Sequence, residues 1–290
     1  MRTALVTDTT TDFPVDVARR LNIETGDVVF VVDGNAIAIG LDLDMDDFLR
    51  RVESRTGRVS TAGVNAEAFT GAYERALAHA PEVLCITMPK VLSSTWVFAG
   101  VARNLFEPGQ VEVFDSRQVG LGQAVLVLLA AEWAQAGLAR QEIVDRLTAL
   151  VPRTVTYMIG QSYGVTTDIG RLHGNAGTGE DETQAASLEP GQRVYAIQRV
   201  GDSEFRPHGR AAGLDQAVEM LVEGALKDCG DVPLCAIIEH VAAPDAATLI
   251  ADAIGSRFPG SRIEIWGARP TVSFFGGGRG SFGVGLSPLP

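Results

Sequence analysis

The chain has 290 residues, a mass of 30.7 kDa and a formal net charge of −12, with 46% hydrophobic and 21% charged residues. This length exceeds that of an ordinary domain, and the composition is globular, which excludes a mainly disordered chain. The acidic balance argues against nucleic acid as a partner, because a protein that binds a phosphate backbone carries a basic surface.

Short apolar runs with β-branched residues alternate with helical patterns along the chain. The predicted strands span residues 4–7, 28–32, 83–87, 111–114, 155–159, 194–197, 234–238 and 262–266. The predicted helices span residues 14–21, 45–54, 66–80, 94–106, 119–136, 140–150, 214–227 and 244–257. Such alternation predicts an α/β fold with a largely parallel sheet.

Three segments interrupt this alternation. Residues 28–39 read as a small β-hairpin, since Asp33-Gly34 between two apolar runs supplies the positive φ of a tight turn. Residues 170–191 lack periodicity and predict a long irregular loop or lid. A boundary beside Pro152 divides the chain into an N-terminal α/β domain, residues 1–152, and a C-terminal α/β domain, residues 153–290.

The sequence offers no sign of an oxidising compartment or a membrane span. Cys85, Cys229 and Cys235 lie in apolar surroundings without the C-x-x-C spacing of a metal knuckle. The N-terminus runs straight into a strand pattern without a signal peptide. The longest apolar run, residues 124–131, is far shorter than the roughly 20 residues of a membrane helix. We therefore expect a cytoplasmic protein without an integral membrane segment.

Hydroxyl-rich turns follow several predicted strands of the first half. They are Thr7-Asp8-Thr9-Thr10-Thr11-Asp12, Leu92-Ser93-Ser94-Thr95 and Asp115-Ser116, with Val59-Ser60-Thr61-Ala62-Gly63 before another helix. Parallel sheets bind ligands at the carboxyl ends of their strands, and hydroxyls with helix N-terminal N–H groups bind anions without a fixed positive charge. A carboxylate or phosphate head group is the expected ligand, and ordinary helix capping is the alternative for each turn.

Two catalytic or regulatory alternatives remain open. An α/β hydrolase or transferase would use Ser93 as its nucleophile, with a base from among His79, His173, His208 and His240, although no G-x-S-x-G motif is present. A phosphate- or nucleotide-binding regulator would use residues 276–280, a glycine-rich run that lacks the Lys and Ser or Thr of a P-loop.

One acidic segment has the spacing of a calcium loop. Asp42, Asp44, Asp46 and Glu53 match positions one, three, five and twelve of an EF-hand, but Asp47 occupies the sixth position, where that loop requires glycine. We therefore interpret the acids as the N-terminal turn of a helix and expect no metal.

The order of these segments resembles the DegV family of bacterial fatty-acid-binding proteins. Residues 6–12 resemble the family's T-D-S-x-x-D opening, Thr61 falls on the Thr of T-S-Q-P, and Leu92-Ser93-Ser94-Thr95-Trp96 is similar to L-S-G-T-Y. Asp115-Ser116 resembles the family's D-S pair, and Gly170-Arg171-Leu172 the end of G-G-R-I. The resemblance implies two α/β domains, with an acyl chain in an apolar tunnel of the N-terminal one.

The resemblance also implies residue roles. Thr61 and Ser93 would bind the fatty acid carboxylate through their hydroxyls, helped by the backbone N–H of Ser94. Arg171 and Arg210 resemble basic positions that would contact a dihydroxyacetone-kinase-like fatty acid kinase or its nucleotide. The protein would be a carrier without catalysis or cofactor, whose ligand is the fatty acid.

The chain departs from the family pattern at two places. The best alignment leaves Gly276 where the family has a carboxylate-facing His, and Leu188-Glu189-Pro190-Gly191 lacks the Lys of I-K-P-I. Arg279 lies close enough in sequence to replace the His, because a guanidinium binds a carboxylate through two parallel hydrogen bonds. The alternative is that Arg279 points to solvent and that hydroxyl and N–H groups bind the head group alone.

Overall fold

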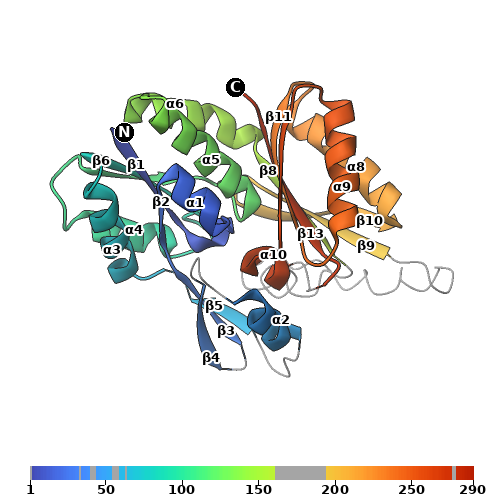
Figure 1. The fold of residues 1–290 in the computed structure, drawn as a ribbon, viewed down its shortest axis with the longest axis horizontal. Coiled ribbons are helices and arrows are strands. Elements are labelled where there is room, and N and C mark those ends of the chain that lie inside the picture. Colours follow the sequence, from blue (N-terminus) through green and yellow to red (C-terminus); the bar gives the residue numbers. More distant parts are fainter. Residues whose placement is uncertain are drawn as a thin grey trace.

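The computed structural model describes residues 2–32, 34–39, 44–53, 59–62, 64–160, 194–275 and 279–290 (Figure 1). Within them, two larger sheets lie side by side, each with helices on both faces, and a small third sheet extends from the first. The α/β fold expected from the sequence is confirmed.

The first sheet is parallel throughout. Its order is β2-β1-β6-β7, formed by β2 (Ile23–Gly26), β1 (Thr3–Asp8), β6 (Glu82–Thr87) and β7 (Val111–Asp115). Side chains alternate along β1, so that Ala4 and Val6 share a buried cluster with α3 (Ala66–Leu77) and α4 (Thr95–Arg103). Leu5 points to the other face, where α1 (Val15–Leu21) packs. Gly26 allows α3 to approach closely, because a Cβ there would lie 3.2 Å from the ring of Phe69 on this helix.

The small sheet contains the predicted hairpin. β3 (Val28–Val32) pairs antiparallel with β4 (Asn35–Ile39) and, on its other edge, with β5 (Val59–Ala62). Gly34 has a φ of +79° in the turn, which confirms the expectation from Asp-Gly. Helix α2 (Met45–Glu53) packs on this sheet through Phe48, whose ring centroid is 5.9 Å from that of Phe30.

The second sheet is mixed. Its order is β10-β9-β8-β13-β11-β12, formed by β10 (Glu204–Ala212), β9 (Val194–Gly201), β8 (Val155–Gly160), β13 (Phe282–Pro288), β11 (Leu234–His240) and β12 (Arg262–Trp266). Only β11 and β12 pair in parallel, and the remaining described pairs are antiparallel. The largely parallel arrangement expected of the whole chain therefore holds for the first sheet alone. Helices α8 (Leu214–Cys229) and α9 (Pro244–Arg257) cover the outer face.

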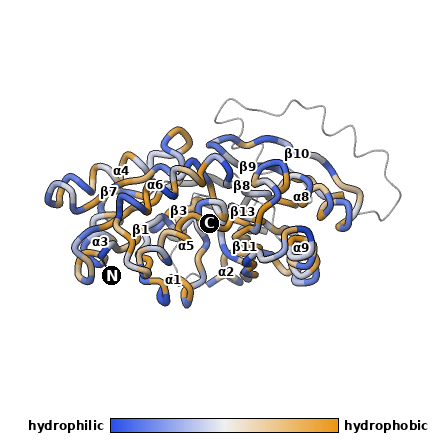
Figure 2. Tube along the Cα trace, turned by 90° about the horizontal axis from the view of Figure 1, so that it is seen from above, coloured by the Kyte–Doolittle hydropathy of each residue, from blue (hydrophilic) through white to orange (hydrophobic). Residues whose placement is uncertain are grey.

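Helix α5 (Leu121–Gln135) forms a layer between the two large sheets, together with α6 (Arg140–Leu150). Twelve of its fifteen residues are buried, as expected of a helix that is apolar on all sides. In the view of Figure 2, α5 lies between β1 and β13. Gly285 of β13 lies directly against it, since a Cβ at this position would come within 2.4 Å of the Leu121 backbone. A single buried cluster therefore joins residues of both sheets.

The predicted domain boundary falls in the 3-10 turn Val151–Arg153, between α6 and β8. The chain passes there from the first sheet to the second, but the core cluster around α5 crosses the boundary and contains Leu5 as well as Ile237. The division into residues 1–152 and 153–290 therefore stays a prediction.

The remaining expectations are met in part. The structure adds strands β2, β5, β10 and β13 and helix α10 (Pro270–Phe275), which the sequence patterns did not indicate. The three cysteines are buried and free. None of the helices in the described ranges has both the length and the apolar character to cross a bilayer. The loop expected at residues 170–191 lies outside the described residues.

Candidate functional site

The carboxyl ends of β1, β6 and β7 meet at one edge of the parallel sheet, as the sequence predicted for the hydroxyl-rich turns. The segments that follow these strands are the 3-10 turn Thr9–Thr11, the loop 88–94 before α4, and the loop 116–120 before α5. Their polar groups divide into some that hold the edge together and others that remain accessible to a ligand.

Asp8 belongs to the groups that hold the edge together. Its buried carboxylate accepts hydrogen bonds from the backbone N–H of Thr10 at 3.2 Å, the backbone N–H of Met88 at 3.0 Å and Nε2 of Gln123 at 2.9 Å. The hydroxyl of Thr9 accepts a bond from the N–H of Val28 at 2.9 Å. Because these groups are buried and bonded to one another, the first turn is a structural junction rather than a ligand surface.

Ser116 has a similar structural role. Its hydroxyl donates to the carbonyl of Gln118 at 3.0 Å, and its backbone N–H donates to the carbonyl of Thr87 at 3.1 Å. The residue is fully buried. The predicted Asp115-Ser116 turn therefore fixes the neighbouring loop and presents no hydroxyl to solvent.

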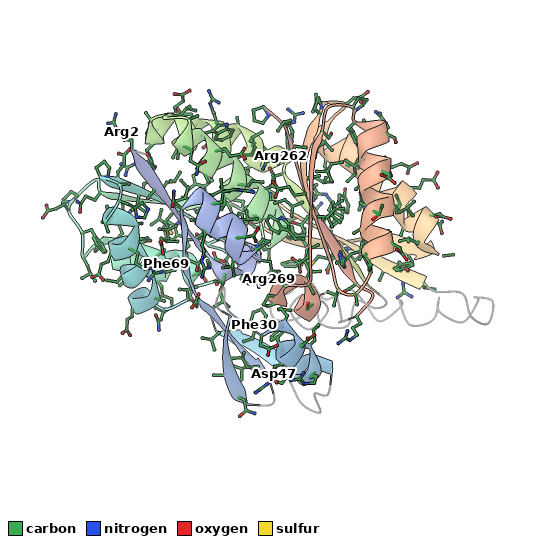
Figure 3. The ribbon with its side chains drawn as sticks, in the orientation of Figure 1. Arg2, Phe30, Asp47, Phe69, Arg262 and Arg269 are labelled. Carbon is green, nitrogen blue, oxygen red and sulfur yellow. The ribbon has the colours of Figure 1, made fainter. Side chains whose placement is uncertain are left out.

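Asp12 connects this edge to the second sheet. Its carboxylate accepts the N–H of Thr271 at 2.9 Å and that of Val272 at 3.1 Å, at the start of α10. Glu239, at the end of β11, accepts the N–H of Arg269 at 2.8 Å. Asp12 is 1% exposed and Glu239 fully buried. Arg269, labelled in Figure 3, lies beside α10 at the junction between the sheets.

Burial raises the pKa of Asp12 to about 6, although the nearby Arg269 charge and the two N–H groups act in the opposite direction. Burial also raises the pKa of Glu239 well above its usual range, and the adjacent Asp12 charge raises it further. Two neighbouring buried carboxyl groups resist simultaneous ionisation, so the pair holds a proton over part of the neutral range.

The loop 88–94 provides the accessible groups. The Ser93 hydroxyl is half-buried, lies 2.9 Å from Oγ1 of Thr95 and accepts the Thr95 N–H at 3.2 Å. Ser94 is exposed, and its side chain makes no capping bond to α4. The predicted site residues Ser93 and Ser94 therefore lie at the N-terminus of a nine-residue helix, where the helix dipole favours an anion.

An apolar cluster lies directly beneath this loop. Leu92 and Met88 pack against a buried group that includes Phe30, Phe69 and Tyr73. The ring centroids of Phe69 and Tyr73 are 5.9 Å apart, and the Tyr73 hydroxyl donates to the carbonyl of Ala99 on α4 at 3.1 Å. Figure 3 places Phe69 on α3 and Phe30 on the small sheet. One short loop therefore borders both a polar surface and an apolar interior.

The other predicted site residues are distributed more widely. Thr61 lies in β5, where it pairs with Phe30, and its side chain is outside the description. Arg279 is exposed and precedes Gly280, whose N–H donates to the carbonyl of Val241 just after β11. Arg210 is half-buried on the edge strand β10, opposite Ala196. Arg171 lies outside the described residues. No described contact joins Arg279 or Arg210 to Ser93.

The catalytic alternative finds no support in the described geometry. The described partner of the Ser93 hydroxyl is Thr95, whereas a nucleophilic serine requires a histidine within hydrogen-bond reach. Nδ1 of His240 accepts the N–H of Ala243, and Nε2 of His208 lies 3.2 Å from the carbonyl of Met220. His173 lies outside the described residues, as do Gly276, Gly277 and Gly278 of the glycine-rich run.

The described part of the acidic segment, residues 44–53, begins a helix, as interpreted from the sequence. Oδ1 of Asp44 accepts the N–H of Asp47 at 3.0 Å, which caps α2. The Asp47 carboxylate pairs with Arg50 and Arg51, whose hydrogen bonds lower the pKa of Asp47. Asp42 lies outside the described residues.

Sequence reasoning missed the polar groups that come from the second half of the chain. Glu239, Arg269 and Thr271 reach the junction from β11 and the start of α10. The available signal is that Glu239 ends a run of buried strand residues, where a charged side chain is unusual. Gln123 was missed because it lies within the long apolar pattern of α5.

Together, these features define a class of protein: an α/β protein of two large sheets with a polar, hydroxyl-bearing edge above an apolar cluster. The sequence profile of the DegV family, a family of uncharacterised proteins, matches residues 2–289. The chain belongs to the DegV family.

Relatives and solved structures agree with this assignment. A DegV domain-containing protein of Mycobacterium tuberculosis is 26% identical over 294 residues, which cover 99% of each chain. One of Deinococcus radiodurans is 27% identical over 294 residues, which cover 100% of this chain and 99% of the relative.

The solved structures share the fold at lower identity. A DegV lipid-binding protein from Thermotoga maritima has a TM-score of 0.82 at 16% identity, covering 100% of this chain and 99% of the other. A Thermus thermophilus DegV protein described for fatty acid binding has a TM-score of 0.81 at 21% identity, with full coverage of both chains. The Streptococcus pneumoniae Fatty Acid Kinase B3 protein loaded with linoleic acid has a TM-score of 0.78 at 16% identity, again with full coverage.

Proposed function

We propose that this protein binds a long-chain fatty acid and carries it without catalysing a reaction. The observation that carries the proposal is the loop 88–94, in which the Ser93 hydroxyl lies at the sheet edge and Leu92 packs against the apolar cluster. An amphiphile with a carboxylate at one end and methylenes at the other matches such a boundary. Each buried methylene contributes about 0.8 kcal/mol, so a long chain supplies most of the affinity.

In this proposal, the carboxylate contacts the Ser93 and Thr61 hydroxyls and the backbone N–H of Ser94. Arg279 is a further ligand for the same carboxylate, reached across the junction between the sheets. The Arg279 contribution has a simple signature, because lysine keeps the charge but loses the two parallel bonds. Arg279→Lys should therefore retain more affinity than Arg279→Ala.

Presentation of the carboxylate to a fatty acid kinase is part of the proposal. It is supported by the structural likeness to the pneumococcal protein described as a Fatty Acid Kinase B3 protein. Arg171 and Arg210 are the proposed contacts with the kinase or its nucleotide. A soluble carrier of this kind acts in the cytoplasm and needs no cofactor besides the bound lipid.

Mass spectrometry of the purified protein tests lipid binding directly. Protein expressed in bacteria should retain host fatty acid at close to one molecule per chain, because a buried acyl chain dissociates slowly. Native spectra would show the added mass, and denaturing spectra with organic extraction would identify the lipid. Repeated preparations that yield no extractable fatty acid would overturn the carrier proposal.

The head-group contacts predict a specific pattern of variant affinities. Ser93→Ala and Thr61→Ala should each weaken fatty acid binding by about 1 to 3 kcal/mol, the range for a lost bond to a charged acceptor. Ser94→Ala is the matched control, because its backbone N–H persists and its side chain makes no capping bond. Displacement of a fluorescent fatty acid measures the affinity of all three variants. Melting curves show how far Ser93→Ala also lowers stability, because it removes the hydrogen bond from the Thr95 N–H to the Ser93 hydroxyl. Unchanged affinity in both Ser93→Ala and Thr61→Ala would place the carboxylate elsewhere.

A further inference from the structure

The hydroxyl of Thr87 differs from the other buried hydroxyls at the carboxyl ends of the first sheet. Oγ1 of Thr7 donates to the carbonyl of Ile86 at 2.8 Å. Oγ of Ser116 donates to the carbonyl of Gln118 at 3.0 Å. Thr87 is equally buried, yet its Oγ1 has no hydrogen-bond partner among the described residues. A buried hydroxyl without a partner destabilises a folded protein, so its retention here requires a reason.

Thr87 faces the apolar cluster beneath the loop 88–94. Side chains alternate along β6, so Thr87 lies on the same side of the sheet as Cys85, which belongs to the cluster that contains Phe69. Ile86 points to the opposite side, into the core around α5. The Thr87 hydroxyl therefore lies at the end of the strand, on the wall of the apolar interior that we propose to hold the acyl chain.

The two carboxylates beside Thr87 are engaged elsewhere. Thr87 pairs in register with Asp115 of β7, whose Oδ1 accepts the N–H of Arg117 at 3.1 Å. On the other side, β1 pairs with β6 up to Ile86, so Asp8 follows next to Thr87. Both oxygens of the Asp8 carboxylate already accept hydrogen bonds from other groups. The Thr87 hydroxyl therefore retains the capacity to donate to a ligand.

The loop 88–94 folds back over the end of β6. The N–H groups of Leu92 and Ser93 both donate to the carbonyl of Pro89, at 3.0 and 3.1 Å, so the loop closes within a single turn. Ser93 therefore remains near the strand end at which Thr87 lies, and Leu92 packs against the cluster that Thr87 faces. The hydroxyls of Thr87 and Ser93 come from the two ends of one short turn.

We propose that Thr87 is a further binding residue for the fatty acid carboxylate, to which its hydroxyl donates from beneath the loop. This inference rests on the proposed function, because it names another contact for the same head group. A carboxylate offers about four acceptor positions on its two oxygens, so Thr87 and Ser93 can both donate to it. The ligand then supplies the partner that the folded protein lacks, and the head group lies between the loop and the end of β6.

Substitution of Thr87 by residues of similar size separates a ligand contact from a structural one. Thr87→Val replaces the hydroxyl by a methyl group and should weaken fatty acid binding about tenfold. Its melting temperature should stay the same or rise, because no bond within the protein is lost. Thr87→Ser keeps the hydroxyl and should retain most of the affinity. Displacement of a fluorescent fatty acid measures the affinities, and thermal unfolding of the delipidated proteins measures stability.

Thr7→Val is the matched control. Thr7 lies on the neighbouring strand and is equally buried, but its hydroxyl donates to the carbonyl of Ile86 and accepts a bond from Nε2 of Gln123. Thr7→Val removes both bonds and should therefore lower the melting temperature. Its affinity for the fatty acid should stay within about twofold of that of the unmodified protein, because Thr7 faces away from the apolar cluster. The two variants should thus have opposite effects on stability and affinity.

The head group of the probe gives a readout that a purely structural role would not change. The methyl ester of the same fatty acid has no charge, and its hydrogen bond with a hydroxyl is weaker than that of a carboxylate. Thr87→Val should therefore reduce the affinity for the acid about tenfold but that for the ester only about twofold. A distorted acyl site would weaken the binding of both probes equally.

Three results would contradict these proposals in different ways. If Thr87→Val binds the fatty acid as tightly as the unmodified protein does, the hydroxyl is not a head-group contact and the inference is overturned. It is also overturned if Thr87→Val melts at a lower temperature and loses affinity for acid and ester alike. Both results leave the carrier proposal standing, whereas preparations that neither contain nor bind fatty acid would overturn both proposals.

Discussion

The two large sheets differ in strand direction, and this difference assigns them different roles. In the parallel first sheet, the carboxyl ends of the neighbouring strands β1, β6 and β7 lie at one edge, so the three loops that follow them gather there. In the second sheet, most neighbours are antiparallel, so loops leave alternately from opposite edges. The first sheet thus concentrates polar groups, whereas the second reaches the junction mainly through β11 and α10.

The largest effect is expected where helix α5 joins the two sheets. Gly285→Val would place side-chain atoms within 2.4 Å of the Leu121 backbone, which cannot move without displacing α5. Because the layer packs against both sheets, we expect the free energy of unfolding to fall by about 3 kcal/mol or more. Urea denaturation followed by circular dichroism measures the loss.

Gly267→Ala is the control for this substitution, since a Cβ at Gly267 meets nothing within 4 Å. Its unfolding free energy should change by no more than about 0.5 kcal/mol. If Gly285→Val unfolds at the same urea concentration as Gly267→Ala, the close contact between β13 and α5 does not hold the two sheets together.

An intermediate effect is expected at the Asp12–Glu239 pair. A folded-state pKa of about 6 for Asp12 lies above its usual value of 3.8, so the folded protein binds more protons than the unfolded chain between these values. Stability from this pair is therefore present at low pH and is lost as the pH rises through about 6. The raised pKa of Glu239 extends the loss to higher pH.

Glu239→Gln removes one of the two charges and keeps an oxygen that can accept the Arg269 N–H. The variant should be more stable than the unmodified protein at pH 8 and should lose less stability between pH 5 and pH 8, because Asp12 can then ionise alone. Thermal unfolding at several pH values measures the difference. Parallel curves for the two proteins would contradict both the raised pKa of Glu239 and its interaction with Asp12.

The smallest effect is expected at the surface link between the two sheets. Arg117, before α5, pairs with Asp202 in the β9–β10 turn, and their side chains are 47% and 58% exposed. Asp202→Asn keeps the left-handed backbone conformation accessible, since asparagine tolerates the φ of 53°. We expect a loss below about 0.5 kcal/mol in urea unfolding, because water and salt weaken exposed pairs. A loss comparable to that of Gly285→Val would instead make this surface pair a main link between the sheets.

The sequence predicted the first sheet better than the second, for physical reasons. Strands β1 and β6 are buried on both faces and therefore appear as largely apolar runs, whereas β7 is only partly buried and was found from its Val and Phe residues. Strand β13 was not predicted, because Gly283 and Gly285 stand where a strand usually has β-branched residues. Glycine is required there, since a Cβ would collide with Val272 at position 283 and with Leu121 at position 285. Strand β10 contains Pro207 and a bulge before Gly209, both of which obscure strand periodicity.

The candidate site shows the same division. Ser93 and Ser94 were found because local sequence alone places them between a strand and a helix. Thr7, Asp8 and Ser116 were chosen by the same reasoning, yet the structure uses them to join neighbouring segments. Only the tertiary contacts determine which hydroxyls form hydrogen bonds within the protein and are therefore unavailable to a ligand. Glu239 and Arg269 could not be assigned to this junction from sequence, since their partner Asp12 lies more than 200 positions earlier.

The position of β13 has a consequence for the order in which the protein is made. This strand follows every other described helix and strand in the chain, yet it occupies an interior place in its sheet, between β8 and β11. A ribosome therefore releases β8, β9 and β11 before the strand that must separate β8 from β11 exists. Until then, the edges of β8 and β11 expose unpaired backbone groups, and Leu121 of α5 lacks its partner at Gly285. Completion of the second sheet must await the end of translation of this segment, so a nascent chain interrupted before residue 282 would be a substrate for chaperones or proteases.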